Sequence, residues 1–321
     1  MNLSLSKIKI LSVLLCTISL LVIGCNSTHY NISPKAEKYL EEVLTLLKEK
    51  SINKHEINWH EFNNDVFHFA QNSQTIEDTY PAINYAVNNL KDNHSYFYPV
   101  TRDSDDIDEK PLPLPKDEIT PSDIGYVRLP FCIGDEEQTL VYIQSVADKI
   151  SNQNNEKIKG WIIDLRDNFG GNMWPMMAAV GSVLYTGTQG YFFDADNKAT
   201  EWHYENGRVY ADNAMRAENK NIVSLYGKDK IAVLVNGQTA SSGEAMAVLF
   251  KGYSTVSLFG TPTFGVSTGC EPFIFSDGSR INLATSVFTD RNKEKYGGAI
   301  MPDIPCSESE TLSKAIEWIY K

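Results

Sequence analysis

Short runs that are apolar almost throughout alternate with helical patterns along the C-terminal two thirds of the chain, and this alternation limits the fold more than any other feature. The run at 161–165 reads Trp-Ile-Ile-Asp-Leu, and the run at 231–235 reads Ile-Ala-Val-Leu-Val. Such runs are typical of buried strands, and strands that alternate with helices predict a layered α/β fold. Strands are expected at 125–129, 161–165, 231–235 and 256–259, and helices at 136–152, 173–185, 242–252 and 311–320.

The N-terminal part has a different pattern. Apolar residues recur at helical spacing after Pro34, a residue suited to the first turn of a helix. Further helical patterns at 56–71 and 75–91 complete a small helical subdomain that we expect over 34–95. Residues 96–124 contain an acidic run and several prolines, which predict a connector, and 125–321 form the expected core.

The first 25 residues predict export. Lys7 and Lys9 precede an apolar stretch at 10–23, which is typical of a signal peptide and is short for a membrane-spanning helix. The stretch ends in Val-Ile-Gly-Cys, which resembles the lipobox of bacterial lipoproteins. We therefore expect a signal peptide at 1–24, a lipid on Cys25, a tether at 25–33 and a location at the cell surface or in the periplasm. An ordinary signal peptide or an uncleaved anchor is the alternative.

The composition restricts the partners. The formal net charge is −12 and becomes −14 if Lys7 and Lys9 leave with the signal peptide, which disfavours nucleic acids and anionic lipid surfaces as partners. Three cysteines remain after Cys25, and their odd number and their spacing predict neither a metal site nor a disulfide. They are Cys132, Cys270 and Cys306.

Two strand-to-helix junctions carry the candidate chemistry. After the strand at 161–165, charged residues lead into Gly170 and Gly171, where glycines let backbone N–H groups approach a ligand closely. After the strand at 231–235, Ser241 precedes a predicted helix, whose dipole and free N–H groups favour an alkoxide or an oxyanion. Each junction also has a plainer interpretation: a glycine turn in the first case and, because Glu244 follows Ser241 by three residues, a capping box in the second.

Taken together, the junctions resemble a known family. Asp-Leu-Arg-x-Asn-x-Gly-Gly at 164–171 and Thr-Ala-Ser-Ser-Gly-Glu at 239–244, with Pro-Asp-Ile at 302–304, are similar to the C-terminal processing (tail-specific) and tricorn-type serine peptidases. The resemblance implies a crotonase/ClpP-like α/β core with β-rich elaboration and no cofactor or metal. It also implies that Ser241 is the nucleophile, and that the amides of Ser242 and of Gly170 or Gly171 form the oxyanion hole.

The general base departs from the processing peptidases. Their lysine, twenty-five residues after the serine, is replaced here by Val266, which cannot accept a proton. His94 lies in an Asp-x-His-Ser segment that resembles the one carrying the histidine of tricorn-type members, and histidine suits a serine hydroxyl near neutral pH. The glutamate expected seven residues before Asp303 is absent, so Glu294 or Asp290 is a possible orienting carboxylate, although both also fit solvated loop charges.

The length narrows the resemblance further. About thirty residues separate His94 from Gly125, too few for a PDZ module. The chain thus resembles the PDZ-less nisin resistance proteins, which cleave a cationic lantibiotic near its C-terminal end. We expect an exported, lipid-anchored serine endopeptidase acting on lantibiotic-type peptides or on misprocessed, unfolded proteins. The alternative, favoured by the missing lysine and glutamate, is an inactive peptide- or lipophile-binding lipoprotein of the same fold.

Overall fold

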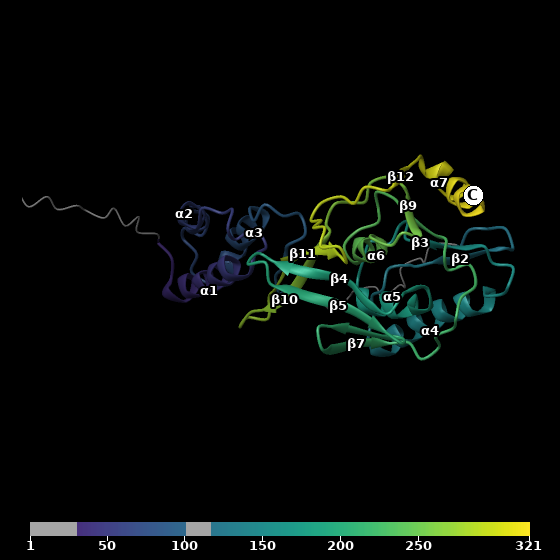
Figure 1. Ribbon diagram of the computed structural model, residues 1–321. Coiled ribbons are helices and arrows are strands. Elements are labelled where there is room, and N and C mark those ends of the chain that lie inside the picture. The colour runs from purple at the N-terminus through teal and green to yellow at the C-terminus, as the bar shows by residue number, and fades with distance from the viewer. Residues whose placement is uncertain (1–30, 101–116) are drawn as a thin grey trace, which may run out of the picture.

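The computed structural model describes residues 31–100 and 117–321 (Figure 1). The predicted signal peptide, Cys25 with most of the tether, and the acidic, proline-rich part of the connector lie outside the described residues. Within the described ranges, no helix has the length and hydropathy needed to cross a membrane. The predicted domain boundaries stay predictions.

A parallel sheet forms the centre of the core. Its strand order is β12-β9-β8-β3-β2, and all four pairings are parallel. The four strands expected from apolar runs are all present. The strands are β2 (Ile124–Arg128), β3 (Gly160–Asp164), β8 (Ile231–Val235), β9 (Val256–Gly260) and β12 (Ile304–Pro305).

Helices cover both faces of this sheet because alternate side chains of its strands point to opposite sides. Ile163 and Val233 face the larger core cluster, whereas Ile162 and Leu234 face the smaller cluster around the last helix. The larger cluster also takes side chains from α4 (Glu136–Gln153), α5 (Met173–Ala179) and α6 (Ser242–Phe250), and the smaller one from α7 (Thr311–Tyr320).

A second, antiparallel sheet extends from the core toward the N-terminal helices (Figure 1). The strands within 186–230 are not evident from the sequence, because they are only partly buried and mix polar with apolar residues on both sides. The strands are β1 (Tyr96–Tyr98), β4 (Gly187–Asp194), β5 (Ala199–Glu205), β6 (Arg208–Ala211), β7 (Ala214–Glu218), β10 (Thr268–Ile274) and β11 (Arg280–Asp290).

The three predicted N-terminal helices are present and pack on the hairpin formed by β10 and β11. A short 3₁₀ turn, Glu77–Thr79, precedes the third helix. In the hairpin turn, the carboxylate of Asp277 accepts hydrogen bonds from the hydroxyls of Tyr39, at 3.0 Å, and Tyr80, at 2.7 Å. The helices are α1 (Pro34–Lys50), α2 (Trp59–Phe69) and α3 (Tyr80–Asn88).

We predict that Asp277→Ala destabilises the protein by about 1–3 kcal/mol, because it removes the acceptor of the buried Tyr39 side chain and of Tyr80. Urea unfolding of the variant and of Asp65→Ala, an exposed carboxylate on α2, measures the difference. Equal unfolding midpoints for the two variants would contradict the role assigned to Asp277.

Candidate active site

The loops that follow β3 and β8 meet because these two strands are parallel neighbours, so both strands end at the same edge of the sheet. Hydrogen bonds then join the loops. The N–H of Ala240 donates to the carbonyl of Asn168 at 2.9 Å, and the hydroxyl of Thr239 donates to the carbonyl of Leu165 at 2.9 Å. The glycine loop is thereby fixed against the segment that carries Ser241.

Ser241 lies immediately before α6 with an uncommon backbone conformation, φ 51° and ψ −119°. An ordinary N-cap residue occupies the β region, so this serine differs from a simple helix cap. A residue other than glycine held in such a conformation costs about 1–3 kcal/mol. A strained turn from a strand into a helix is also the arrangement that presents the nucleophile of many serine hydrolases.

Glycine is required at position 170 by the close approach of the two loops. A Cβ atom placed there would lie 2.9 Å from the Cβ of Ser241, and the φ of Gly170 is +120°. The N–H of Gly170 donates to Oδ1 of Asn168 at 3.0 Å, so this amide is already occupied. The amides of Gly171 and Ser242 have no hydrogen-bond acceptor within the described part of the chain. Those two N–H groups are the ones available to a ligand.

Glu244 connects Ser241 to the turn at 263–266. One carboxylate oxygen accepts from the N–H groups of Ser241 and Val266, each at 2.9 Å. The other accepts from the hydroxyl of Thr263 at 2.6 Å and the N–H of Gly265 at 2.9 Å. Burial raises the pKa of Glu244, although the four hydrogen bonds oppose this effect. From the sequence, Glu244 was expected only as the capping partner of Ser241.

His94 lies on the other side of the same turn. Its Nδ1 is 2.8 Å from the hydroxyl of Thr268, and its backbone N–H donates to Asp92. Burial lowers the pKa of His94, while the nearby Asp92 charge and a hydrogen bond with Thr268 partly offset this effect. No hydrogen bond joins the ring to Ser241 in the parts of the chain described here. Nε2 of the ring makes no hydrogen bond to a described residue.

A small cavity of about 180 Å³ connects His94 with the turn that Glu244 holds. Gly265, Val266 and Thr268 line this cavity together with His94. The position of the lysine of the processing peptidases is therefore next to the candidate histidine. Thr268 carried no motif in the sequence, and its contact with His94 spans 174 positions of the chain.

The structure places neither of the two carboxylates considered as orienting groups against the His94 ring. Asp290 is buried and accepts from the N–H groups of Asn292, at 2.8 Å, and Glu294, at 2.9 Å, so that it closes a turn. Glu294 is exposed, and neither carboxylate hydrogen-bonds to the His94 ring. Within the described residues, no group of three or more histidine, cysteine or acidic side chains could hold a metal ion.

Lys251, which follows the last residue of α6, is engaged elsewhere. Its Nζ lies 2.6 Å from Oδ1 of Asp303 and 3.2 Å from the carbonyl of Met301. Asp303 also accepts from the N–H of Leu258, so the Pro-Asp-Ile segment is fastened to β9. This lysine is therefore not positioned as a base for the serine.

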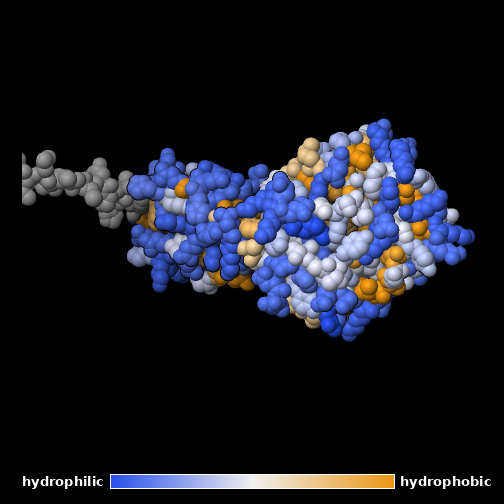
Figure 2. Space-filling model, viewed as in Figure 1, coloured by the Kyte–Doolittle hydropathy of each residue, from blue (hydrophilic) through white to orange (hydrophobic). Residues whose placement is uncertain are grey.

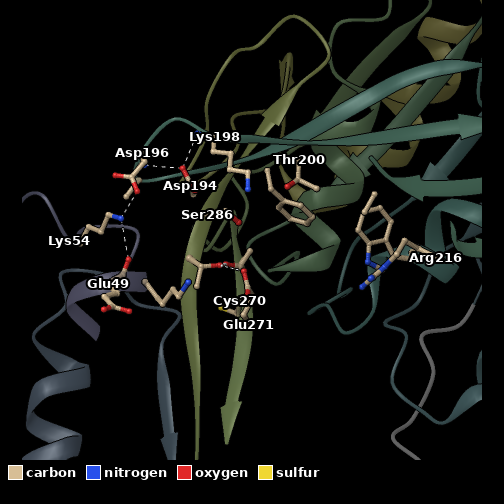
Figure 3. Close-up of a pocket in the computed structure, with 17 residues that line it drawn as sticks. Glu49, Lys54, Asp194, Asp196, Lys198, Thr200, Arg216, Cys270, Glu271 and Ser286 are labelled. Atoms are coloured by element: carbon tan, nitrogen blue, oxygen red, sulfur yellow. Dashed lines mark hydrogen bonds and ion pairs between the residues drawn. The ribbon is translucent and has the colours of Figure 1, made fainter. Parts of the chain in front are cut away.

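A larger cavity of about 600 Å³ lies between the end of α1 and the antiparallel sheet (Figure 3). Lys54 reaches across it to Asp196 at 2.6 Å. Cys270, on the wall formed by β10, is a weak donor to the carbonyl of His94. The cavity is thus separated from His94 by a single strand, and its lining contains charges of both signs.

The sequence model of peptidase family S41 matches residues 123–306. The chain belongs to peptidase family S41. Over 296 residues it is 26% identical to the nisin-resistance protein of Lactococcus lactis subsp. lactis, a match that covers 90% of this chain and 89% of that protein. It is also 32% identical over 143 residues to the carboxy-terminal processing protease CtpA of Bacillus subtilis (strain 168), covering 44% of this chain and 27% of that protease.

The fold comparison agrees with this assignment. A lipoprotein from Streptococcus agalactiae superposes with a TM-score of 0.73 at 24% identity, covering 91% of this chain and 98% of that one. Together the matches confirm the predicted family and its mixed α/β fold with N-terminal helices. The S41 peptidases are serine proteases.

We predict that Glu244→Gln lowers the free energy of unfolding by about 1–3 kcal/mol, because an amide nitrogen would face N–H groups that now have an acceptor. Urea unfolding of Glu244→Gln beside Glu42→Gln, an exposed glutamate on α1, tests this. If both variants unfold at the midpoint of the parent, the carboxylate does not hold the turn as described.

Proposed function

We propose that this chain is an exported, lipid-anchored serine peptidase with Ser241 as nucleophile and His94 as general base. The observation that carries the proposal is the conformation of Ser241: it is strained, directly precedes α6, and lies against a glycine loop in which the amide of Gly171 is unoccupied. A purely structural helix cap requires none of these features.

The proposed reaction is acyl transfer in two steps. Nε2 of His94 takes the hydroxyl proton of Ser241 while the oxygen attacks the peptide carbonyl, and the amides of Gly171 and Ser242 stabilise the oxyanion. His94 then protonates the departing amine, and water hydrolyses the acyl-enzyme by the same route. Such hydrogen bonds often tighten only when substrate binds, so an approach of His94 to Ser241 on substrate binding is part of the proposal.

A histidine base fits the charges of the site better than a lysine does. Val266 offers no proton acceptor, and Lys251 is ion-paired with Asp303. With its pKa lowered by burial, His94 is neutral at physiological pH and has a free lone pair for the serine proton. Thr268 would keep the ring oriented, a part that a carboxylate plays in many triads.

The substrate we propose is a peptide or an unfolded protein segment cleaved near its C-terminus. The identity with a nisin-resistance protein supports a lantibiotic-type peptide, and the identity with CtpA supports a misprocessed protein. The acidic chain would favour cationic peptides. A lipid on Cys25 would keep the enzyme at the cell surface or in the periplasm, where such peptides arrive.

We predict that Ser241→Ala and His94→Ala each lower peptide hydrolysis by at least about 10³-fold, because each removes one partner of the proton transfer. Digestion of a peptide library followed by mass spectrometry measures the loss, with Ser309→Ala and His68→Ala as controls at positions far from the site along the chain. If the parent and both site variants bind the same peptides and none cleaves them, the chain is a binding lipoprotein of the same fold.

We predict that kcat/KM rises with pH through a midpoint below about 6.5, the ordinary pKa of histidine, because burial lowers the pKa of His94 and only its neutral form accepts a proton. Above that midpoint the rate should stay level through neutral pH. Asp92→Asn should move the midpoint lower still, since the Asp92 charge raises the pKa of His94. A rate that climbs only in the alkaline range would identify a lysine base instead.

A further inference from the structure

We propose that the cavity between the 130–134 segment and α4 receives a neutral, apolar side chain of the substrate, on the carbonyl side of the bond that is cleaved. This inference rests on the proposed peptidase function. The cavity has a volume of about 540 Å³, within the range of sites that hold small organic groups. Pro130, Phe131, Ile133 and Val141 contribute much of its lining.

The wall of this cavity is directly joined to the candidate oxyanion site. The N–H of Cys132 donates to the carbonyl of Gly170 at 3.0 Å. The carbonyl of Cys132 accepts from the N–H of Asn172 at 2.7 Å. A Cβ atom on Gly171 would lie 3.1 Å from Cγ1 of Ile133. Gly171, whose amide is proposed to hold the oxyanion, therefore lies close to the apolar wall. A carbonyl bound there would carry its own side chain toward that wall.

The charged side chains that line the cavity are already paired, which argues against a charged ligand. Lys149 lies 2.7 Å from Asp117, and Arg128 lies 2.6 Å from Asp167. The hydroxyl of Tyr142 donates to the carbonyl of Pro130 at 2.8 Å. Because these donors and acceptors have partners, an incoming charge would lose its water without gaining an ion pair.

The carboxylate in the lining, that of Asp117, is paired with Lys149. Burial raises the pKa of the Cys132 thiol to about 11, so that this side chain is neutral in the physiological range. A cationic side chain would therefore find no free negative charge here.

The apolar groups, by contrast, are exposed. Ile133 is 62% and Val141 is 64% accessible, and the ring of Phe131 stacks on Phe169, with centroids 4.3 Å apart, beside Gly170. Figure 2 shows hydrophobic surface over the α4 side of the core. An apolar side chain placed here would cover surface that water now contacts, which is favourable in proportion to the area buried.

The test uses diphenyl phosphonate esters that carry a leucine, phenylalanine, lysine or aspartate side chain next to phosphorus. In the labelling step the Ser241 oxygen bonds to phosphorus, one phenoxide leaves and the hydroxyl proton is released. The full-length parent is compared with Ile133→Asp and with Leu140→Asp. Leu140 is 58% exposed on α4 and lines a neighbouring cavity but not this one, so it is a matched control.

We expect the parent to react about tenfold or more faster with the leucine and phenylalanine probes than with the charged ones. Ile133→Asp should lose most of that preference and gain relative reactivity with the lysine probe, whereas Leu140→Asp should behave like the parent. Val141→Asp, on α4, provides a second variant should Ile133→Asp fold poorly.

Two results would overturn the inference. If the parent reacts at similar rates with all four probes, or if Ile133→Asp and Leu140→Asp change the rates alike, the subsite is wrong while the peptidase proposal stands. If no probe labels the parent, or if Ser241→Ala is labelled equally well, the proposed function itself fails and the subsite fails with it.

Discussion

The parallel pairing of β3 with β8 is the constraint on which the candidate site depends. Asp164 is in register with Leu234, so the two strands end at the same level of the sheet and the loops that follow begin side by side. Ile162 and Leu234 pack below the sheet, while Ile163 and Val233 pack above it. A shift of one residue in this register would send each of these side chains to the opposite face. Burial of the strands therefore fixes how Ser241 meets the glycine loop.

Glu244 explains how a strained serine can persist in this fold. The left-handed backbone of Ser241 costs free energy, and a buried carboxylate is unfavourable as well. Each is stabilised by the other, because the N–H of Ser241 donates to Glu244 and three further donors come from the 263–266 turn. The capping box predicted from the sequence is thus present, with the N–H of Ser241 donating to the Glu244 carboxylate. The two interpretations of Ser241, as a helix cap and as a candidate nucleophile, therefore describe the same strand-to-helix junction.

The sequence could predict the elements that burial dictates and could not predict those that depend on tertiary contacts. Four strands of the parallel sheet were evident because they are apolar throughout, and the motif loops follow from their ends. Strands β4–β7 were missed because their side chains are only partly buried. The helix expected at 173–185 ends at Ala179, before Gly181, where a Cβ atom would lie 2.8 Å from the hydroxyl of Tyr204. The contact of His94 with Thr268 and the occupied amide of Gly170 arise only after folding.

The source of the candidate base has a structural consequence. A lysine in the 263–266 turn would belong to the same core as Ser241, but His94 comes from the segment that follows α3. Its neighbour Ser95 accepts the N–H of Ala284 on β11, so the antiparallel sheet positions the histidine. That sheet is in turn covered by the N-terminal helices, whose side chains share a core with Ile281 and Leu283. If His94 is the base, the site therefore forms only when the N-terminal helices are docked on the β10–β11 hairpin. A serine–lysine pair would not depend on this docking, because both residues would come from the core.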